Sequence, residues 1–488
     1  MSGIDPARLL AALAAGDLLV EVPRAFPPVS GLTADSRSVA AGHAFVAVRG
    51  SLDDGHRFAG AAVRAGAAAL VVERPLGLGV PEILVRDSRR AAIALARAWY
   101  DDPARALGLV GVTGTSGKTT STALVRHLLN GEGEAGSMGT LGAFDGRGES
   151  VVSTAGSLTT PGPIDLQATL ARLLERGCRV VAMETSSHSL DQGRLDGVVF
   201  AGALFTNLSR EHLDYHQTME AYRAAKLRLL DLLAPDGVVA VNRDDPAWAA
   251  IPSGARVIGF GLGREGELRA RDLLLGAGGS RFVVDGRFGA REVSLPLPGA
   301  FNVANALGAA AVTLGMGLSF DRVMERLERA PQVPGRMERL VESPFVVLRD
   351  YAHKPDALER VLQSLRPLTS GRLTVVFGCG GDRDRGKRPM MGQIAARLAD
   401  LTVVTSDNPR TEDPDRILDD IVAEWPGGAP LERISDRRAA IGWALDRAEP
   451  GDTVLLAGKG NETYQIIGHE HFPFDERTIV RSHLGLAD

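Results

Sequence analysis

Residues 111–120 have the sequence Gly-Val-Thr-Gly-Thr-Ser-Gly-Lys-Thr-Thr, and this glycine-rich stretch constrains the architecture more than any other part of the chain. It follows a short apolar segment at 107–110 and opens a helical pattern at 119–129. Between a strand and a helix, glycines let backbone N–H groups surround a phosphate, and lysine reaches its outer oxygens. The sequence therefore predicts a phosphate-binding loop in which Lys118 contacts the nucleotide and the Thr119 hydroxyl contacts Mg²⁺.

Length and composition indicate a multidomain globular protein. At 488 residues the chain is too long for one core, and about 150 residues per domain suggests roughly three domains. A formal net charge of −5 gives no electrostatic reason to expect a nucleic-acid partner. Only Cys178 and Cys379 are present, so there is no disulfide framework, and a cytoplasmic location is expected. The first residues lack the basic region of a signal peptide.

One apolar segment needs to be distinguished from a membrane span. Residues 293–320 contain no charged side chain, but they include two prolines, two asparagines and several glycines. This composition favours a buried helix that begins near Phe301 over a helix that crosses a bilayer. We therefore expect a soluble protein without a membrane partner.

Apolar runs and helical patterns divide the chain into three blocks, at 1–106, 107–335 and 336–488. The breaks fall at Asp101-Asp102-Pro103 and around Pro334. Strands are expected at 44–48, 68–72, 83–85, 180–183, 203–206, 238–241, 345–348, 373–377, 402–405 and 453–457, and helices at 56–65, 89–100, 356–365 and 393–398. This alternation predicts an α/β protein with mostly parallel sheets and crossover helices.

Many of these strands lead directly into polar or glycine-rich clusters. The clusters lie at 184–188, 206–207, 350–354, 378–383, 407–410 and 458–462. Ligands of open α/β sheets bind beyond the carboxyl ends of the strands. Because two blocks have such polar clusters at the carboxyl ends of their strands, we expect an active site shared across a cleft between domains.

Three residues of the second block bear on metal binding. Glu184 ends an apolar strand, where ATP-hydrolysing folds commonly keep a carboxylate that holds Mg²⁺. Imidazole is an unusual ligand for this hard cation, so chemistry alone does not assign His212 to it. By its sequence surroundings, Lys226 resembles an ordinary solvated helix lysine.

The third block carries residues suited to an amino-acid ligand. Arg383 lies in a cationic loop after one strand, and Asn408 and Arg410 follow the next. The planar fork of arginine suits bidentate recognition of a carboxylate, and Glu462 could bind an ammonium group. These residues predict a site for a zwitterionic amino acid.

The ordered set of motifs resembles the Mur ligase family along essentially the whole chain. The matching motifs are Thr-Ala-Asp-Ser-Arg at 33–37, the phosphate loop, Thr-Thr-Pro at 159–161, Glu-Thr-Ser-Ser-His at 184–188, Asn-Leu-Ser-Arg-Glu-His-Leu-Asp-Tyr-His at 207–216, Phe-Asn-Val-Ala-Asn-Ala at 301–306, Pro-Gly-Arg-Met-Glu at 334–338, Asp-Tyr-Ala-His at 350–353, Asp-Asn-Pro-Arg at 407–410 and Gly-Lys-Gly at 458–460. Each motif is weak alone, whereas the complete series is very specific.

The resemblance implies a UDP-sugar-binding α/β domain, a central ATPase domain and a C-terminal Rossmann-like domain that brings an amino acid. It implies ATP-dependent addition of meso-diaminopimelate to the D-glutamyl γ-carboxylate of UDP-N-acetylmuramoyl-L-alanyl-D-glutamate, in peptidoglycan precursor synthesis. The carboxylate would attack the γ-phosphate of ATP, and the amine would then displace phosphate from the acyl phosphate. Two Mg²⁺ ions and a monomeric state are expected.

The resemblance also assigns residues position by position. Nucleotide binding falls to Gly114, Thr115, Ser116, Gly117, Lys118, Thr119, Thr120, Asn302, Arg336, Asp350 and His353. The UDP-muramoyl dipeptide would contact Ser36, Ser51, Leu52, Asp53, Thr159, Thr160, Ser186, Gln192 and Arg194. The amino acid would contact Arg383, Asp407, Asn408, Pro409, Arg410, Gly458 and Glu462. The implied catalytic residues are Lys118, Glu184, His212 and Lys226, and the implied metal ligands are Thr119, Glu184, His212 and Lys226 as its carbamate.

Two positions depart from the family pattern; the first is a small polar change that should be tolerated, and the second leaves the amine donor open. Ser116 stands where the family usually has asparagine, and Asn461 stands where it usually has histidine. A second carboxylate on the substrate would satisfy Arg410, which favours meso-diaminopimelate over lysine or ornithine. Folylpolyglutamate synthetase and a non-enzymatic nucleotide switch are the alternative classes.

Overall fold

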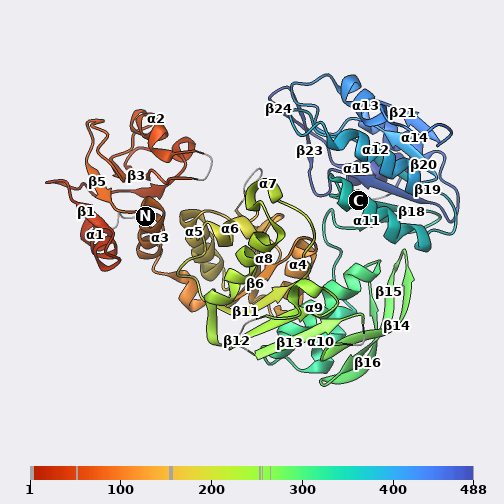
Figure 1. Cartoon of the computed structure of the whole chain (residues 1–488), viewed down its shortest axis with the longest axis horizontal. Coiled ribbons are helices and arrows are strands. Elements are labelled where there is room, and N and C mark those ends of the chain that lie inside the picture. Colours follow the sequence, from red (N-terminus) through yellow and green to blue (C-terminus); the bar gives the residue numbers. More distant parts are fainter. Residues whose placement is uncertain are drawn as a thin grey trace. The chain divides into compact units, whose positions relative to one another are not determined.

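The structure is a computed structural model that describes residues 5–50, 53–152, 158–251, 254, 256–263 and 265–486 (Figure 1). It separates into two compact units. The first comprises the described residues up to Phe260 together with Gly308–Leu318, and the second comprises Gly261–Leu307 and the described residues from Ser319 onward. The predicted α/β class is confirmed, since each unit combines sheets with helices. The domain limits 1–106, 107–335 and 336–488 stay a prediction.

The N-terminal sheet has the strand order β1-β5-β4-β3-β2. Its elements are α1 (Pro6–Ala15), β1 (Leu19–Glu21), β2 (Gly31–Thr33), η1 (Ser36–Ser38), β3 (His43–Val46), η2 (Gly55–Phe58), α2 (Ala59–Arg64), β4 (Ala69–Val72), β5 (Glu82–Val85), α3 (Ser88–Trp99) and η3 (Pro103–Ala106). Alternate residues of a strand face opposite sides. Accordingly, Val71 packs in a core with α1 and α3, whereas Leu70 and Val72 pack with α2.

The central sheet of the first unit places the phosphate loop between two strand ends. Its elements are β6 (Gly108–Thr113), α4 (Lys118–Leu129), β7 (Ala135–Gly139), β8 (Gly142–Phe144), β9 (Ser150–Val152), α5 (Pro163–Glu175), β10 (Val180–Glu184), α6 (Ser187–Asp191), β11 (Phe200–Phe205), α7 (Leu213–His216), α8 (Met219–Leu227), η4 (Arg228–Leu232), β12 (Leu233–Asn242), η5 (Pro246–Trp248) and β13 (Arg256–Gly261). Strand β6 pairs in parallel with β10 on one side and with β11 on the other. The loop after β6 therefore lies beside the residues that follow both neighbours.

The predicted parallel character of this sheet holds for its centre. The order β13-β12-β11-β6-β10-β7 is followed by β8 and β9, which pair antiparallel at the edge. Leu166, Leu170 and Leu173 of α5 share a core cluster with sheet residues such as Val181 and Met183.

The second unit begins with three antiparallel strands that the alternation did not predict. They are β14 (Leu268–Gly276), β15 (Gly279–Gly286) and β16 (Gly289–Leu295), and they precede α9 (Ala300–Gly315) and α10 (Phe320–Leu327). The buried helix expected from Phe301 is confirmed by α9, which begins one residue earlier. Among the described residues, no helix combines the length and apolar character needed to cross a membrane.

The C-terminal sheet has the order β17-β18-β22-β19-β20-β21, and only β17 is antiparallel to its neighbour. The elements of this part of the chain are β17 (Glu338–Val341), β18 (Val346–Asp350), α11 (Pro355–Leu365), η6 (Arg366–Leu368), β19 (Leu373–Phe377), α12 (Lys387–Leu398), β20 (Leu401–Val404), α13 (Pro414–Val422), β21 (Leu431–Arg433), α14 (Arg437–Leu445), β22 (Thr453–Ala457), β23 (Tyr464–Ile467), β24 (Glu470–Pro473) and α15 (Glu476–His483). Strands β23 and β24 form a separate antiparallel pair. The helix predicted at 393–398 corresponds to α12, which is longer than predicted and starts at Lys387.

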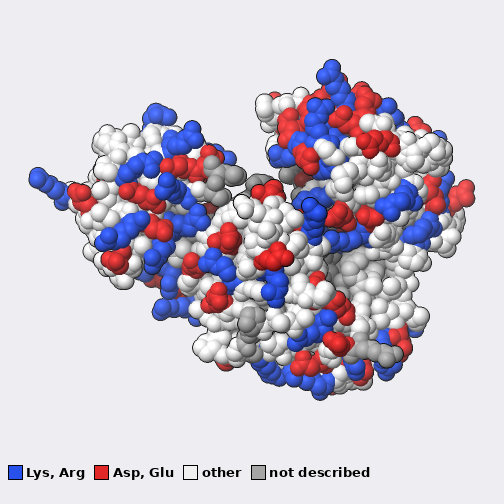
Figure 2. Space-filling model, in the orientation of Figure 1, with Lys and Arg blue, Asp and Glu red and all other residues white. Residues whose placement is uncertain are grey.

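This sheet is covered on both faces, as a doubly wound domain requires. Val375 and Phe377 pack with α11, α12 and α13, whereas Val376 between them packs with α14 and α15. Every residue of β19 is buried, and all but Thr374 are apolar, as expected for a strand covered on both faces. On the visible face of the whole chain, Figure 2 shows positive and negative side chains intermixed.

Candidate active site

The phosphate loop is held open by two glycines in left-handed conformations. Gly114 has a φ of 150°, and a Cβ atom there would lie 1.9 Å from the Thr206 hydroxyl. Gly117 has a φ of 82° and forms the N-cap of α4. Any side chain at position 114 would collide with the residue after β11, so glycine is required by packing as well as by conformation.

Residues after β11 fix the loop from the side. The backbone N–H of Thr115 donates to the Asn207 carbonyl at 2.7 Å, and that of Ser116 donates to the Asn207 side chain at 2.9 Å. The Thr206 hydroxyl donates to the Ser116 carbonyl at 2.7 Å. The predicted strand–loop–helix is thus confirmed, and a second polar segment braces it.

Two lysines converge on one carbonyl of this loop. Lys118 Nζ donates to the Gly114 and Thr115 carbonyls, each at 2.9 Å. Lys226 Nζ donates to the Gly114 carbonyl at 2.8 Å. Two ammonium groups on one carbonyl create a strongly positive locus that suits the phosphates of a nucleotide.

The interpretation of Lys226 as a solvated helix lysine is wrong. Its exposed fraction is 1%, because α8 turns this side chain toward the loop and Tyr222. Burial, reinforced by the charge of Lys118, lowers the pKa of the Lys226 amine well below its usual value. The amine is therefore far easier to deprotonate than a surface lysine.

Aromatic and imidazole rings surround this lysine. Its Nζ lies 4.4 Å from the centre of the Tyr222 ring, and Tyr222 contacts both His212 and His216. His188 stacks edge-on against His212 with ring centres 4.8 Å apart. His212, which has a φ of 56°, also lies 3.8 Å from the Glu211 carboxylate. The structure therefore brings His212 and Lys226 to the same ring cluster.

Glu184 lies at the end of β10 and is oriented by a threonine. Its Oε1 accepts from the Thr140 backbone N–H at 2.9 Å, and its Oε2 accepts from the Thr140 hydroxyl at 3.1 Å. It is 2% exposed and pairs in register with Val112 of β6. The carboxylate thus lies at the same sheet edge as Thr119, which opens α4 and is also buried.

The predicted dipeptide residues gather around Glu184. The Thr160 hydroxyl donates to the Glu184 carbonyl at 2.9 Å, and it lies 3.4 Å from the Ser186 hydroxyl. The Thr159 hydroxyl accepts from Thr140 at 3.4 Å. These hydroxyls form one polar surface beside the strand end.

Arg194 and Gln192 extend this surface. Arg194 Nε donates to Gln192 Oε1 at 2.9 Å, and its Nη1 donates to the Thr160 carbonyl at 3.2 Å. Gln192 Nε2 in turn donates to the Tyr215 hydroxyl at 3.2 Å. Five predicted residues from two segments therefore meet: Thr159, Thr160, Ser186, Gln192 and Arg194.

The remaining UDP-side residues belong to the N-terminal sheet. Ser36 is half-buried and begins η1, and Asp53 is exposed, with its carbonyl accepting the Gly50 N–H at 2.9 Å. The predicted residues Ser51 and Leu52 lie outside the described residues. No contact joins Ser36 or Asp53 to the hydroxyl surface around Glu184 among the contacts of the described chain.

Three of the four nucleotide residues of the second unit form one cluster. Arg336 lies over the Tyr351 ring at 4.6 Å, and Asp350 accepts from the backbone N–H groups of Met337 and Ala352. Burial raises the pKa of Asp350 and lowers that of His353 to about 4. Asn302 is separate, since its amide donates to the Pro298 carbonyl at the start of α9.

The amino-acid residues gather around a buried lysine that the sequence predictions did not single out. Lys459 is fully buried and donates to Asn408 Oδ1 at 3.1 Å and to Glu462 Oε2 at 3.3 Å. Asn408 Nδ2 also donates to Glu462 Oε2, at 2.9 Å. Asp407 lies close to Gly458, where a Cβ atom would be 2.6 Å from its carboxylate. The sequence feature that could have identified Lys459 is its position between Gly458 and Gly460 in a family motif.

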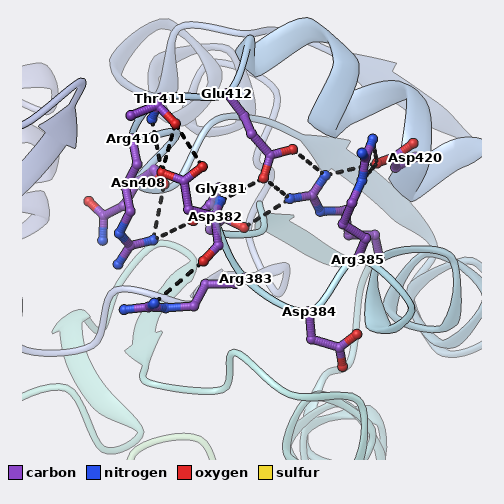
Figure 3. A network of polar contacts seen from close by, with 12 residues as sticks. Gly381, Asp382, Arg383, Asp384, Arg385, Asn408, Arg410, Thr411, Glu412 and Asp420 are labelled. Carbon is purple, nitrogen blue, oxygen red and sulfur yellow. Dashed lines mark hydrogen bonds and ion pairs between the residues drawn. The ribbon is translucent and has the colours of Figure 1, made fainter.

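Arg410 and Arg383 lie on two adjacent loops of this site (Figure 3). Arg410 Nη1 donates to the Gly381 carbonyl at 2.9 Å, while its Nε and Nη2 have no protein acceptor among the described residues. A Cβ atom at Gly380 would lie 2.9 Å from Arg410 Nη1 and 3.7 Å from Arg383 Cγ. Pro409 continues the same loop, its carbonyl packed against Gly381. Two arginine forks are therefore available at one place.

Sequence reasoning also missed Thr140, which orients Glu184, and Tyr222, which contacts the phosphate loop. The Tyr222 hydroxyl lies 3.2 Å from the Thr115 hydroxyl. Its signal was available, because Tyr222 precedes Lys226 by four residues and shares its helix face. Thr140 carries no comparable signal, since it is a loop threonine between β7 and β8.

The donor set around the phosphate loop fits magnesium. Among the described residues, no three His, Cys, Asp or Glu side chains are grouped as a metal site. Mg²⁺ does not need such a group, since it usually keeps waters and binds one or two carboxylates with substrate phosphates. The Thr119 hydroxyl and the buried Glu184 carboxylate supply hard oxygen donors of that kind.

Family models match three successive parts of the chain. The Mur ligase family catalytic domain matches residues 28–108, the Mur ligase middle domain matches 112–313, and the Mur ligase glutamate ligase domain matches 335–460.

Individual proteins resemble the chain along nearly its full length. The UDP-N-acetylmuramoyl-L-alanyl-D-glutamate–2,6-diaminopimelate ligase of Geobacillus kaustophilus is 43% identical over 93% of this chain and 95% of its own. A solved structure of a ligase with the same name is 35% identical, has a TM-score of 0.66, and is matched over 96% of this chain and 97% of its own. Mycobacterium tuberculosis folylpolyglutamate synthase, at 19% identity, 75% and 92% coverage and a TM-score of 0.61, shares the fold.

The phosphate loop, its buried lysine and the arginine-bearing strand ends thus occur in a chain that is similar to these ligases from end to end, and the chain belongs to the Mur ligase family.

Proposed function

We propose that this chain is an ATP-dependent ligase that joins meso-diaminopimelate to the D-glutamyl γ-carboxylate of UDP-N-acetylmuramoyl-L-alanyl-D-glutamate. The observation that carries the proposal is the positive phosphate loop with a polar hydroxyl surface at one strand edge, in a chain that also carries an arginine-rich amino-acid site. The γ-carboxylate attacks the γ-phosphorus of ATP, ADP leaves, and an acyl phosphate forms. The amine then attacks the acyl carbon, phosphate leaves with the C–O bond electrons, and the amine loses a proton.

The residues of the phosphate loop carry the first step. Lys118 and the N–H groups at the start of α4 bind the transferring phosphoryl group, whose charge grows on its outer oxygens. In the present structure Lys118 holds two loop carbonyls, and ATP would exchange them for phosphate oxygens. Asn302, Arg336, Asp350 and His353 are retained as nucleotide residues of the second unit.

Thr119 and Glu184 would hold one Mg²⁺, and His212 together with the Lys226 carbamate would hold a second. When bound, such ions neutralise charge on the phosphoryl group and on the attacking carboxylate. Thr140 fixes the orientation of the Glu184 carboxylate through two hydrogen bonds.

Lys226 is suited to carbamate formation. Its neutral amine adds to CO₂ and loses a proton, which converts a nitrogen donor into an oxygen donor that a hard cation accepts. Burial lowers the pKa of this amine, which makes the loss of its proton, and hence carbamate formation, easier than for a surface lysine. Removal of CO₂ from the buffer is expected to lower activity, and bicarbonate is expected to restore it. A Lys226→Arg variant that responds equally to bicarbonate would contradict the carbamate.

The acceptor is held by the hydroxyl surface and by Arg194. We assign Thr159, Thr160, Ser186, Gln192 and Arg194 to the muramoyl dipeptide, because they surround the strand end that carries Glu184. Ser36, Ser51, Leu52 and Asp53 are assigned to the uridine nucleotide by family resemblance. The N-terminal sheet would then bind the end of the substrate that does not react.

The amino-acid donor is selected by charge at its two ends. Glu462 Oε1, which has no protein partner among the described residues, is available for an ammonium group. The arginine forks of Arg383 and Arg410 are available for a carboxylate. Lysine and ornithine lack a second carboxylate and would leave a positive site unpaired, which strongly disfavours them.

The decisive experiment is ADP release by the full chain with UDP-N-acetylmuramoyl-L-alanyl-D-glutamate. Meso-diaminopimelate, L-lysine and L-ornithine are compared, with folate plus glutamate as the test of folylpolyglutamate synthesis and Lys118→Ala as the negative control. We expect ADP release that requires both the dipeptide and meso-diaminopimelate. ADP release that needs no amino acid, or a rate equal to that of Lys118→Ala, would reject the proposal.

We further propose a cytoplasmic, monomeric enzyme whose three domains divide near residues 106 and 335. The three successive family matches support these divisions. Size-exclusion chromatography with light scattering tests the monomer.

A further inference from the structure

Two loops that carry the arginines of the amino-acid site are joined by a dense polar network (Figure 3). One loop follows β19 and contains Gly380 to Arg383, and the other follows β20 and contains Asn408 to Glu412. The Gly381 N–H donates to the Asn408 carbonyl at 2.9 Å, and the Thr411 hydroxyl donates to Asp382 at 2.8 Å. The separation of Arg383 and Arg410 therefore depends on these loop contacts.

At the back of this network lies one fully buried arginine. Arg388, in the first turn of α12, binds Glu412 through a double contact: Nη1 to Oε2 at 2.9 Å and Nη2 to Oε1 at 2.8 Å. Its Nη2 also donates to the Gly380 carbonyl at 3.2 Å, and its Nη1 donates to Asp420 at 2.8 Å. One guanidinium group thus touches both loops and fixes them to α13.

Glu412, which is held by Arg388, links the loop after β20 to the loop after β19. Its Oε1 accepts the Asp382 N–H at 2.6 Å, and Asp382 holds Thr411 next to Arg410. The Arg388 guanidinium lowers the pKa of Glu412 to about 2, so the carboxylate stays charged. Asp382 and Arg410 both have positive φ values, of 53° and 50°, which only a well-held loop maintains.

Stability is a poor explanation for this arginine. Its Nε is buried without a hydrogen-bond partner, and a buried ion pair is often no better for stability than apolar residues of the same volume. The four contacts instead define where the loops stand relative to each other. The network therefore serves to fix the positions of the two loops rather than to stabilise the fold.

We propose that Arg388 is a positioning residue that sets the substrate preference of the enzyme. It acts through Glu412 and the two loops to hold the Arg410 fork where the far carboxylate of a diamino diacid binds. This inference rests on the proposed function, and it predicts that the loss of Arg388 matters only while Arg410 is present.

The test is a double-mutant cycle with Arg388→Met and Arg410→Ala in the full-length enzyme. We expect Arg388→Met to raise the KM for meso-diaminopimelate at least tenfold, while kcat and the KM for ATP change less than about threefold. In the Arg410→Ala background the same substitution should change that KM less than about twofold. In the single variant Arg388→Met, the ratio of kcat/KM for meso-diaminopimelate to that for L-lysine should fall.

Arg385→Met is the matched control. Arg385 lies in the same segment and binds the same Asp420 at 3.0 Å, but it is exposed and, among the described contacts, makes no hydrogen bond to Glu412. Its KM for meso-diaminopimelate should stay within about twofold of the wild-type value. An equal effect of both variants, or equal effects of Arg388→Met with and without Arg410, would overturn the proposal.

Glu412→Gln gives the same cycle without a buried change if Arg388→Met fails to fold. It keeps one oxygen acceptor for Arg388, and a threefold or larger rise in KM that disappears in Arg410→Ala is expected. An unchanged KM for meso-diaminopimelate, or a rise of the same size with and without Arg410, would contradict the positioning role. A wild-type enzyme that releases no ADP with meso-diaminopimelate would instead contradict the proposed function.

Discussion

Replacement of Arg410 by alanine should weaken the binding of meso-diaminopimelate and spare the nucleotide. Alanine keeps the Cβ atom, so the cost of the positive φ of 50° is the same before and after the substitution. The change therefore isolates the guanidinium group. The substrate loses the fork formed by Nε and Nη2, and the loop loses the hydrogen bond from Nη1 to the Gly381 carbonyl.

The expected magnitude follows from these hydrogen bonds. Hydrogen bonds to charged groups contribute about 1.5–3 kcal/mol to binding, and each 1.4 kcal/mol corresponds to a factor of about ten. The KM for meso-diaminopimelate should therefore rise by roughly 10- to 150-fold. Arg410→Lys should lie between the two proteins, because lysine keeps the charge but cannot form a bidentate pair.

The assay is steady-state ADP release with saturating ATP and dipeptide and varied amino acid. L-lysine is the internal control, because it lacks the carboxylate that Arg410 would bind. Its KM, although higher in the wild-type enzyme, should change less than about threefold in the variant. An unchanged KM for meso-diaminopimelate, or a rise of equal size with L-lysine, would refute the reasoning.

Three further substitutions test other parts of the structure. Gly114→Ala places a Cβ atom 1.9 Å from the Thr206 hydroxyl and should raise the KM for ATP at least tenfold; an unchanged value would show that the loop relaxes freely. Because the pKa of His353 is lowered from 6.5 to about 4, the native state binds fewer protons than the unfolded state between these values, so stability present above pH 6.5 is lost as the pH falls toward 4. His353→Gln should therefore show a smaller fall in melting temperature from pH 7 to pH 5 than the wild-type protein, and equal falls would contradict this. Arg437 and Glu476 form a buried ion pair at 2.8 Å, so Arg437→Met should destabilise the protein by about 3–5 kcal/mol in chemical denaturation; adding Glu476→Leu should recover most of that loss, and no recovery would argue against an unpaired charge as the cause.

Motifs with local geometry were predictable from the sequence. The phosphate loop, the helix after it and the strand before Glu184 all have signals within about ten residues, and the structure confirms their secondary structure. The doubly wound C-terminal sheet was predictable for the same reason. Its central strands β19, β20 and β22 are mostly apolar, and β18, β19, β20 and β21 are each followed by a helix.

Strands β14, β15 and β16 and the environment of Lys226 were not predictable in this way. The three antiparallel strands are largely exposed on one side and carry many charged residues, so no apolar run reveals them. Lys226 looked solvated because a helix lysine is usually exposed and its sequence surroundings reveal no acceptor for its side chain. Its burial depends on Gly114, 112 positions away, which supplies the acceptor for its ammonium group.

Residue order alone was therefore sufficient for the family, the fold class and the kind of chemistry, because a nucleotide loop and strand-end motifs are local patterns of conformation and charge. Only the folded chain decided which polar groups share a site. It placed Lys118 and Lys226 on one carbonyl, turned Glu184 toward Thr140, and joined two arginine loops through Arg388. Such contacts arise from the pairing of distant strands, and the energy of a buried charge depends on neighbours that only this pairing brings near.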